Sequence, residues 1–118
     1  MPTHITSPVR VAAAGSPPKT ITEYVGLVSS GTTAFSVAMM SSPPGWSEPR
    51  QTAEFDECTV VLDGALVVEH SGGTWEIKAG EAVLTHAGET IRYSTPDGAS
   101  YVAICVPAFS PDTVHRSS

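Results

Sequence analysis

Residues 45–64, GWSEPRQTAEFDECTVVLDG, carry the clearest fold signal in this chain. This stretch opens with a glycine behind two prolines, places four acidic side chains in its middle, and ends in an apolar run closed by Asp63-Gly64. Asp-Gly is typical of a tight turn between strands. The acids stand at the entrance of a buried strand, so they form either a binding site or a solvated loop around one structural acid.

Short apolar segments separated by turn residues continue outward from this stretch in both directions. The 118 residues include 10 Gly and 10 Pro, which divide the chain into short pieces. Such spacing with no clear helical pattern predicts an all-β sandwich or small barrel, in one domain over residues 1–118 with a core at about 20–108 and loose termini. The expected strands lie at 9–14, 20–28 (or a single helical turn), 34–40, 58–62, 65–70, 74–78, 81–85, 89–94 and 100–106.

The charge balance and the lengths of the apolar runs indicate which kinds of partner this chain is expected to lack. Twelve acidic residues against six basic ones give a formal charge of -6, whereas nucleic-acid binding needs clustered Lys and Arg. The chain shows no apolar run of about 20 residues for a membrane span and no basic-then-apolar signal peptide at its start. We therefore expect a cytoplasmic protein without nucleic-acid or membrane partners. Cys58 and Cys105 lie in apolar runs and are expected to be buried, reduced thiols.

The stretch 45–64 resembles the first motif of the cupin family, which reads Gly, five residues, His-x-His, three or four residues, Glu, six residues, Gly. In this sequence Gln51 and Ala53 stand at the histidine positions, while Glu57 stands at the glutamate. The glycines and the spacing agree with the family, but two of its metal ligands are replaced.

The second cupin motif, Gly, five residues, Pro-x-Gly, two residues, His, has its counterpart from Gly80 onward. His86 takes the proline position, Gly88 matches, and Ile91 stands where the third metal histidine would be. The resemblance implies the cupin fold, a small double-stranded β-helix or jelly-roll barrel of RmlC-like type. It also implies no metal site and no cofactor, because a lone glutamate holds zinc, iron or manganese poorly.

A closer similarity is carried by AEFDECTVVLDGAL (53–66) and GGTWEIKAGEAVLTHAGETIRYSTPDGASYVAICVPAFSP (72–111). These runs are similar to the small cupins related to the ethanolamine-utilisation Q protein, which also lack the histidine set and keep acids at the barrel mouth. His86 departs from that group, where proline is usual. The resemblance to cupins further implies a homodimer.

Strand alternation predicts which side chains share the barrel lumen. If Glu57 faces the lumen, so does Thr59, and if Ile91 does, so does Tyr93. Gln51 joins them if the intervening turn behaves as in cupins. A carboxylate in this setting is expected to have a raised pKa, which suits a general acid or base.

The predicted catalytic groups are Glu57, Tyr93 and His86. Glu57 is the expected general base or acid, and the alternative is a buried acid that holds the barrel by hydrogen bonds. Tyr93 and His86 are the expected proton partners. The alternatives are a core tyrosine with a satisfied hydroxyl and a solvent-facing turn histidine.

Substrate binding is assigned to Gln51, Trp46, Thr59 and Glu48. Gln51 can orient a ligand but cannot transfer protons. Trp46 either stacks on a flat ligand or covers the barrel end. Glu48, like Glu54 and Asp56, is alternatively a solvated loop acid.

Three functions remain open from the sequence. The first is a metal-independent acid–base enzyme, an isomerase, a lyase of dehydratase type or a cyclase, acting inside the barrel on a small polar or polyketide-like molecule. The second is a non-catalytic cupin that binds a ligand or scaffolds an assembly. The third is a metal-dependent enzyme whose ligands are rebuilt from Glu57, Gln51, His86 and Glu48.

Overall fold

The computed structural model describes residues 1–117, and its regular structure is almost entirely β, as the turn spacing predicts. A single 3-10 turn, η1, covers Pro111–Thr113, and no helix in this part of the chain is long and apolar enough to cross a membrane. The strands are β1 (Val9–Val11), β2 (Thr20–Val25), β3 (Ser36–Ser42), β4 (Trp46–Ser47), β5 (Gln51–Ala53), β6 (Asp56–His70), β7 (Gly73–Lys78), β8 (Ala82–Thr85), β9 (Thr90–Thr95), β10 (Ala99–Val106) and β11 (Val114–Arg116).

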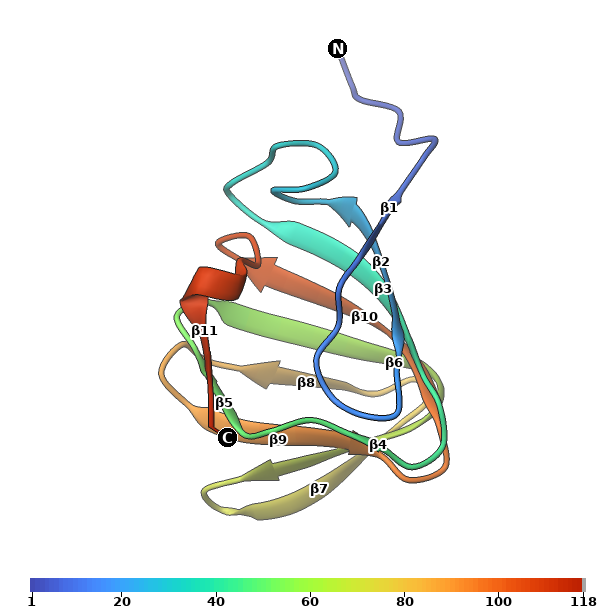
Figure 1. The fold of residues 1–118 in the computed structure, drawn as a ribbon, viewed down its shortest axis with the longest axis vertical. Coiled ribbons are helices and arrows are strands. Elements are labelled where there is room, and N and C mark those ends of the chain that lie inside the picture. Colours follow the sequence, from blue (N-terminus) through green and yellow to red (C-terminus); the bar gives the residue numbers. More distant parts are fainter. Residues whose placement is uncertain (118) are drawn as a thin grey trace.

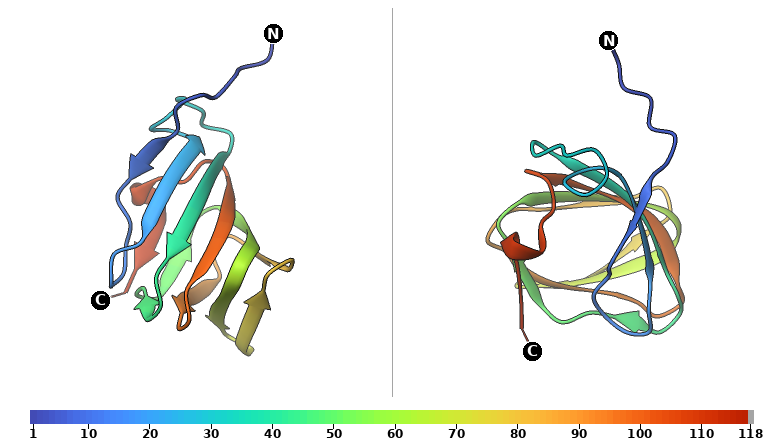
Figure 2. Two further views of the ribbon diagram at one scale, coloured as in Figure 1. Left: turned by 90° about the vertical axis from the view of Figure 1, so that its right-hand side faces the viewer. Right: turned by 45° about the horizontal axis from the view of Figure 1, so that its top comes forward.

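The strands join into one curled sheet with the order β1-β2-β3-β10-β6-β9-β5-β11. Strand β4 pairs with β9, and β7 and β8 both pair with β6. All of these pairs are antiparallel. Figure 1 shows the sheet curling into a barrel, and the left view of Figure 2 shows β1, β2, β3, β10 and β6 side by side. The blue segment after β1 crosses the front of the barrel in Figure 1.

Strand β6 corrects the prediction of a hairpin turn at Asp63-Gly64. The predicted strands 58–62 and 65–70 are one continuous strand that bends at this dipeptide. Its first part pairs with β8 and β10, and its second part pairs with β7 and β9. The dipeptide therefore changes the direction of a strand that is paired on both sides, instead of reversing the chain.

The C-terminal tail is more ordered than its polar sequence suggests. Val114–Arg116 forms β11 on the edge of β5, and Val114 packs against Phe55 and Cys105. Strand pairing with β5 and the packing of Val114 in the core together dock this segment. The last residue of the predicted loose tail, Ser118, lies outside the described residues.

Two clusters of buried side chains form the core. The larger contains Trp46, Leu66, Tyr93 and Tyr101, and the smaller contains Phe55, Cys105 and Val114. The alternation predicted for β6 and β9 is confirmed, since Glu57, Thr59 and Val61 are buried on one strand and Ile91, Tyr93 and Thr95 on the other. Side chains from both clusters line the cavity described next.

Candidate functional site

A cavity of about 300 Å³ lies within the barrel. It is lined by residues of β1, β2, β3, β5, β6, β9 and β10, by the 12–14 segment that follows β1, and by residues near the C-terminus. This volume suits a small molecule. Most of the wall is apolar, and its polar and titratable side chains include Lys19, Glu48, Gln51, Glu57, Thr59, Tyr93, Tyr101, Cys105 and Arg116.

Glu57 is hydrogen-bonded to two other side chains of the cavity, Tyr93 and Cys105. Its side chain is buried, with 8% of the residue exposed. The Tyr93 hydroxyl donates to Oε1 at 2.8 Å, and the Cys105 thiol donates to Oε2 at 3.4 Å. Burial, followed by the charge of Glu57, raises the pKa of both Tyr93 and Cys105. Both donors therefore keep their protons at neutral pH, and each carboxylate oxygen of Glu57 accepts a hydrogen bond.

Glu48 is the second carboxyl group of the cavity. It is 5% exposed, contrary to the interpretation of this residue as a solvated loop acid. Burial raises its pKa to about 7, while the charges of Lys19 and Arg116 lower it and that of Glu57 raises it further. A group with this pKa is both an acid and a base near neutral pH.

The backbone of Glu48 explains why its side chain turns inward. Trp46 and Ser47 form β4 on β9, and the Glu48 amide donates to the Tyr93 carbonyl at 3.3 Å. The Arg92 side chain donates to the Glu48 carbonyl at 3.1 Å. These bonds hold the loop against the barrel.

Lys19 lines the same cavity as Glu48. Its ammonium donates to the Tyr101 hydroxyl at 3.3 Å and to the Met40 sulfur at 3.6 Å, and it lies 4.1 Å from the centre of the Trp46 ring. Burial lowers the pKa of Lys19, and the charges of Glu48 and Glu57 partly oppose this effect.

The predicted residues Gln51, Glu57, Thr59 and Tyr93 all line the cavity, so the structure brings them together. Gln51 is 6% exposed, and Arg116 donates to its side-chain oxygen at 3.5 Å. The Gln51 amide therefore lines the same cavity as Glu57 and is bonded to Arg116 on β11.

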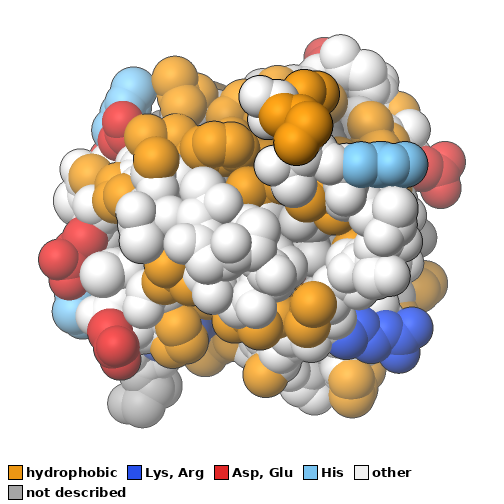
Figure 3. Space-filling model, turned by 90° about the horizontal axis from the view of Figure 1, so that it is seen from above, with side chains coloured by type: hydrophobic (Ala, Val, Ile, Leu, Met, Phe, Trp, Pro, Cys, Tyr) orange, Lys and Arg blue, Asp and Glu red, His pale blue; other side chains and the backbone are white. Residues whose placement is uncertain are grey.

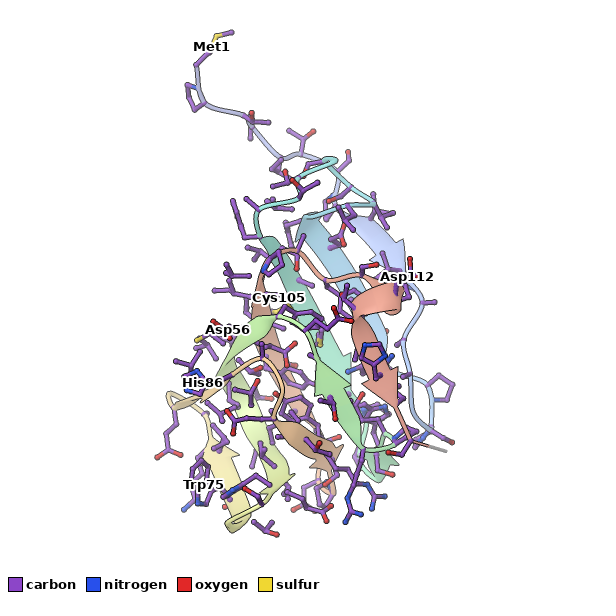
Figure 4. The ribbon with its side chains drawn as sticks, turned by 90° about the vertical axis from the view of Figure 1, so that its left-hand side faces the viewer. Met1, Asp56, Trp75, His86, Cys105 and Asp112 are labelled. Carbon is purple, nitrogen blue, oxygen red and sulfur yellow. The ribbon has the colours of Figure 1, made fainter. Side chains whose placement is uncertain are left out.

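His86 is not brought to the cavity. It is exposed in the turn between β8 and β9, at the outer edge of the molecule near Asp56 (Figure 4). The turn is fixed by its backbone, since Glu89 accepts from the His86 amide at 2.8 Å and Asp56 accepts from the Ala87 amide at 2.9 Å. Its position between two strand ends therefore directs the imidazole outward, away from the predicted proton-transfer partners.

Trp46 packs in the larger core cluster with 1% exposure and does not line the cavity. Its indole nitrogen donates to the Ala14 carbonyl at 3.3 Å, so the ring fastens the segment that crosses the barrel. Of the two interpretations, covering the barrel end agrees with this position. Glu54 and Asp56 are exposed, as expected for loop acids.

The predicted site lacks several polar residues of the cavity, among them Tyr101, Cys105, Arg116 and Lys19. Tyr101 and Cys105 alternate inward on β10, a signal that is readable once the face of that strand is known. The sequence gives no sign that Arg116 reaches the cavity. A polar C-terminal segment has the same residue pattern whether it packs on the barrel or extends into solvent. Lys19 stands in a Pro-Pro-Lys segment, and its sequence allows this segment either to fold over the barrel or to extend into solvent.

The cavity does not fit the metal that the cupin motifs imply in other members. The three histidine positions hold Gln51, Ala53 and Ile91. Among residues 1–117, no three His, Cys, Asp or Glu side chains gather so as to hold a metal ion. The rebuilt ligand set also lacks His86 in the cavity, and we derive no step through a metal.

The comparisons with known proteins agree on family and fold. The family described as ethanolamine utilisation protein EutQ matches residues 18–110. The structure of the Clostridium difficile EutQ protein is 25% identical, with a TM-score of 0.67 over 79% of this chain and 65% of that chain. A cupin-like protein from Thermotoga maritima is 13% identical, with a TM-score of 0.76 over 88% of this chain and 79% of that one. The predicted cupin fold is thereby confirmed.

A curated relative extends the comparison to a longer protein. The endoribonuclease YbeY of Myxococcus xanthus is 43% identical over 103 residues, which are 85% of this chain and 35% of that protein. The chain spans between about a quarter and about a third of the length of the curated relatives it matches.

Proposed function

Because the chain belongs to the EutQ family of cupins, we propose that it is a small-molecule enzyme that moves a proton inside the barrel without a metal. The observation that carries this proposal is that two buried carboxyl groups of one cavity, Glu57 and Glu48, have different surroundings. A third buried acid of the cavity, Glu23, accepts hydrogen bonds from the Val28 and Ser29 amides and so holds the loop after β2. Two titratable groups with different environments are the usual basis of paired acid and base roles. The reaction class is isomerisation, dehydration or cyclisation.

Glu57 acts as the general base in this proposal. Its carboxylate is held in place by Tyr93 and Cys105, so it meets a substrate C–H or O–H in a fixed orientation. Tyr93 stays protonated because burial raises its pKa, and its hydroxyl can turn to a substrate oxygen as charge develops there. Proton transfer by such a positioned group contributes about 10²- to 10⁴-fold to rate.

Glu48 takes the second acid–base role, which the sequence assigned to His86. With a pKa of about 7, it is partly protonated at neutral pH and can return a proton to the substrate. Gln51 orients the substrate by its amide, and Thr59 offers a hydroxyl on the same wall. The apolar remainder of the wall, with Ala38 and Ala103, leaves room for a hydrocarbon body.

The test is hydrogen–deuterium exchange at carbon, followed by proton NMR in deuterated buffer. A panel of small ketones, hydroxy-ketones and β-diketones is incubated with the full chain. We expect at least one compound to exchange its acidic C–H faster with enzyme, and Glu57→Gln to reduce this rate by about 100-fold or more. Glu54→Gln, an exposed acid of the same loop, is the matched control and keeps the rate.

The second candidate is a binding protein without catalysis. One observation favours it: both oxygens of Glu57 are already hydrogen-bonded within the protein, as in a structural acid. A panel compound that raises the melting temperature but shows no exchange, with Glu57→Gln binding it equally well, would replace the enzyme by this candidate.

A further inference from the structure

The chain contains only two lysines, and they occupy opposite environments. Lys78 lies on the surface, with 70% of its side chain exposed and Glu76 at 4.0 Å. Lys19 instead lines the cavity, where its nitrogen contacts the Met40 sulfur and the Tyr101 hydroxyl. Within residues 1–117, Lys19 takes part in no ion pair. The cavity thus contains an amine that is not neutralised by a direct carboxylate contact.

The surroundings of Lys19 act on its charge in both directions. The Trp46 ring beneath the nitrogen favours the ammonium form, as do the more distant charges of Glu48 and Glu57. Burial outweighs them and lowers the pKa of Lys19. A lysine desolvated in a largely apolar pocket is the arrangement that makes an amine nucleophilic in proteins.

We propose that Lys19 is a nucleophile that captures a carbonyl compound in the cavity as an imine. The neutral nitrogen of Lys19 attacks the carbonyl carbon, and the C=O electron pair moves to oxygen. The proton that the attacking nitrogen loses is transferred to this oxygen and gives a carbinolamine. Glu48, in the same cavity, protonates that hydroxyl, which leaves as water while the C=N bond forms. One water is released for each imine, and no oxidant or reductant is needed.

Tyr101 positions the reacting nitrogen. Its hydroxyl accepts from Lys19 and also shares a hydrogen bond of 2.8 Å with Ser42, so the oxygen is fixed from two sides. Burial, above all, raises the pKa of Tyr101, so the phenol remains neutral and does not hold Lys19 as an ion pair. The ammonium can then lose its proton when a ligand displaces water.

Imine formation deepens the proposed function, because it identifies the substrate as a ketone or an aldehyde. A protonated imine withdraws electrons from the neighbouring carbon, which makes its C–H bond a suitable proton source for Glu57. Carbonyl capture by Lys19 nevertheless does not require Glu57 as a base, so the two proposals fail separately.

The experiment uses pentane-2,4-dione with the full chain at pH 7. Its reaction with an amine loses water and gives a stable enaminone, which absorbs in the near ultraviolet and is located by mass-spectrometric peptide mapping. We expect Lys19 to be modified faster than Lys78, because burial lowers the pKa of Lys19 and so increases its fraction of free amine. Equal rates, or faster modification of Lys78, would overturn the proposal.

Variants separate this result from the proposed proton transfer. Lys19→Met is expected to lose the rapid phase of enaminone absorbance, and Lys78→Met, its matched control, to keep it. Glu57→Gln is expected to keep the rapid phase while losing deuterium exchange. A rapid phase that survives in Lys19→Met would show that another group is modified, and it would also overturn the proposal.

Discussion

At the scale of single residues, Glu48 and Glu57 show how contacts decide the behaviour of a carboxyl group. Glu57 accepts hydrogen bonds from a phenol and a thiol, while the Glu48 carboxyl accepts none from the described residues. Burial without hydrogen-bond donors disfavours the charged form, and this is the first cause of the raised pKa of Glu48. The carboxyl group with a pKa of about 7 is therefore Glu48, which the sequence assigned to substrate binding with a solvated loop acid as the alternative.

Replacing Glu48 by glutamine tests this assignment through the pH dependence of stability. The pKa of Glu48 is about 7 in the folded chain, above the usual 4.5, so the folded state binds more protons than the unfolded state between these values. The contribution of Glu48 to stability is present below pH 4.5 and is lost as pH rises through 7. From pH 5 to pH 8, we expect wild type to lose on the order of 2 to 3 kcal/mol more than Glu48→Gln does.

The measurement is the free energy of unfolding in urea at both pH values. Glu76→Gln changes an exposed acid of β7 and serves as the control, with the same pH dependence as wild type. An equal pH dependence in Glu48→Gln and wild type would contradict the raised pKa.

At the scale of elements, strand β6 holds the barrel wall together because it pairs with four other strands. It can do so only by bending at Gly64, whose φ is +73°. A Cβ at Gly64 would overlap the carbonyl oxygen of Gly98 on the neighbouring turn. The glycine of the motif is thus required by both its backbone angle and its close neighbour.

Replacing Gly64 by alanine is expected to lower the free energy of unfolding by about 3 kcal/mol or more, since strain and overlap add. Gly45→Ala is the matched control. Gly45 also has a positive φ, +78°, but its Cβ would meet no atom within 4 Å, so we expect a loss of only about 1 to 2 kcal/mol. Urea denaturation measures both, and an equal loss in the two variants would show that the Gly98 contact is unimportant.

At the scale of the whole molecule, the barrel exposes an apolar sheet face in spite of a net charge of -6. The outward residues pair in register from Met39 to Val102 to Val60, and from Val37 to Ile104 to Cys58 to Leu84, without a charged side chain in either row. Leu62 and Leu84 are 51% and 58% exposed on this face. Seen from the N-terminal end, acidic side chains lie at the margins, and hydrophobic side chains lie between them among uncharged side chains and backbone (Figure 3).

A second copy of this chain is the partner that such a face suits, because a charge-free strip lets two equally negative molecules approach. We therefore expect a homodimer in which this face packs on itself. Leu84→Glu places a charge in the middle of the face and is expected to shift the mass from twice 12.3 kDa to a single chain, as measured by light scattering. Leu27→Glu, at another exposed leucine, serves as the control and stays dimeric. A monomeric wild type would refute the interface.

Most of the strand positions, the glycine spacing of the cupin fold, and the pairs of side chains that share one face of a strand, Glu57 with Thr59 and Ile91 with Tyr93, can be read from the amino-acid sequence. These properties are local, because period-two alternation and turn chemistry depend on neighbours along the chain. The place of Gln51 beside these side chains follows from the resemblance to cupins.

The burial of Glu48, the reach of Lys19 and Arg116 into the cavity, and the position of His86 outside it depend on how the barrel closes. Each of these side chains lies in or next to a loop or a terminal segment. A polar residue there has the same local sequence whether it faces solvent or the core. Its direction is set by which distant strand its backbone bonds to, as Glu48 does to β9, and closure of the barrel alone fixes that choice.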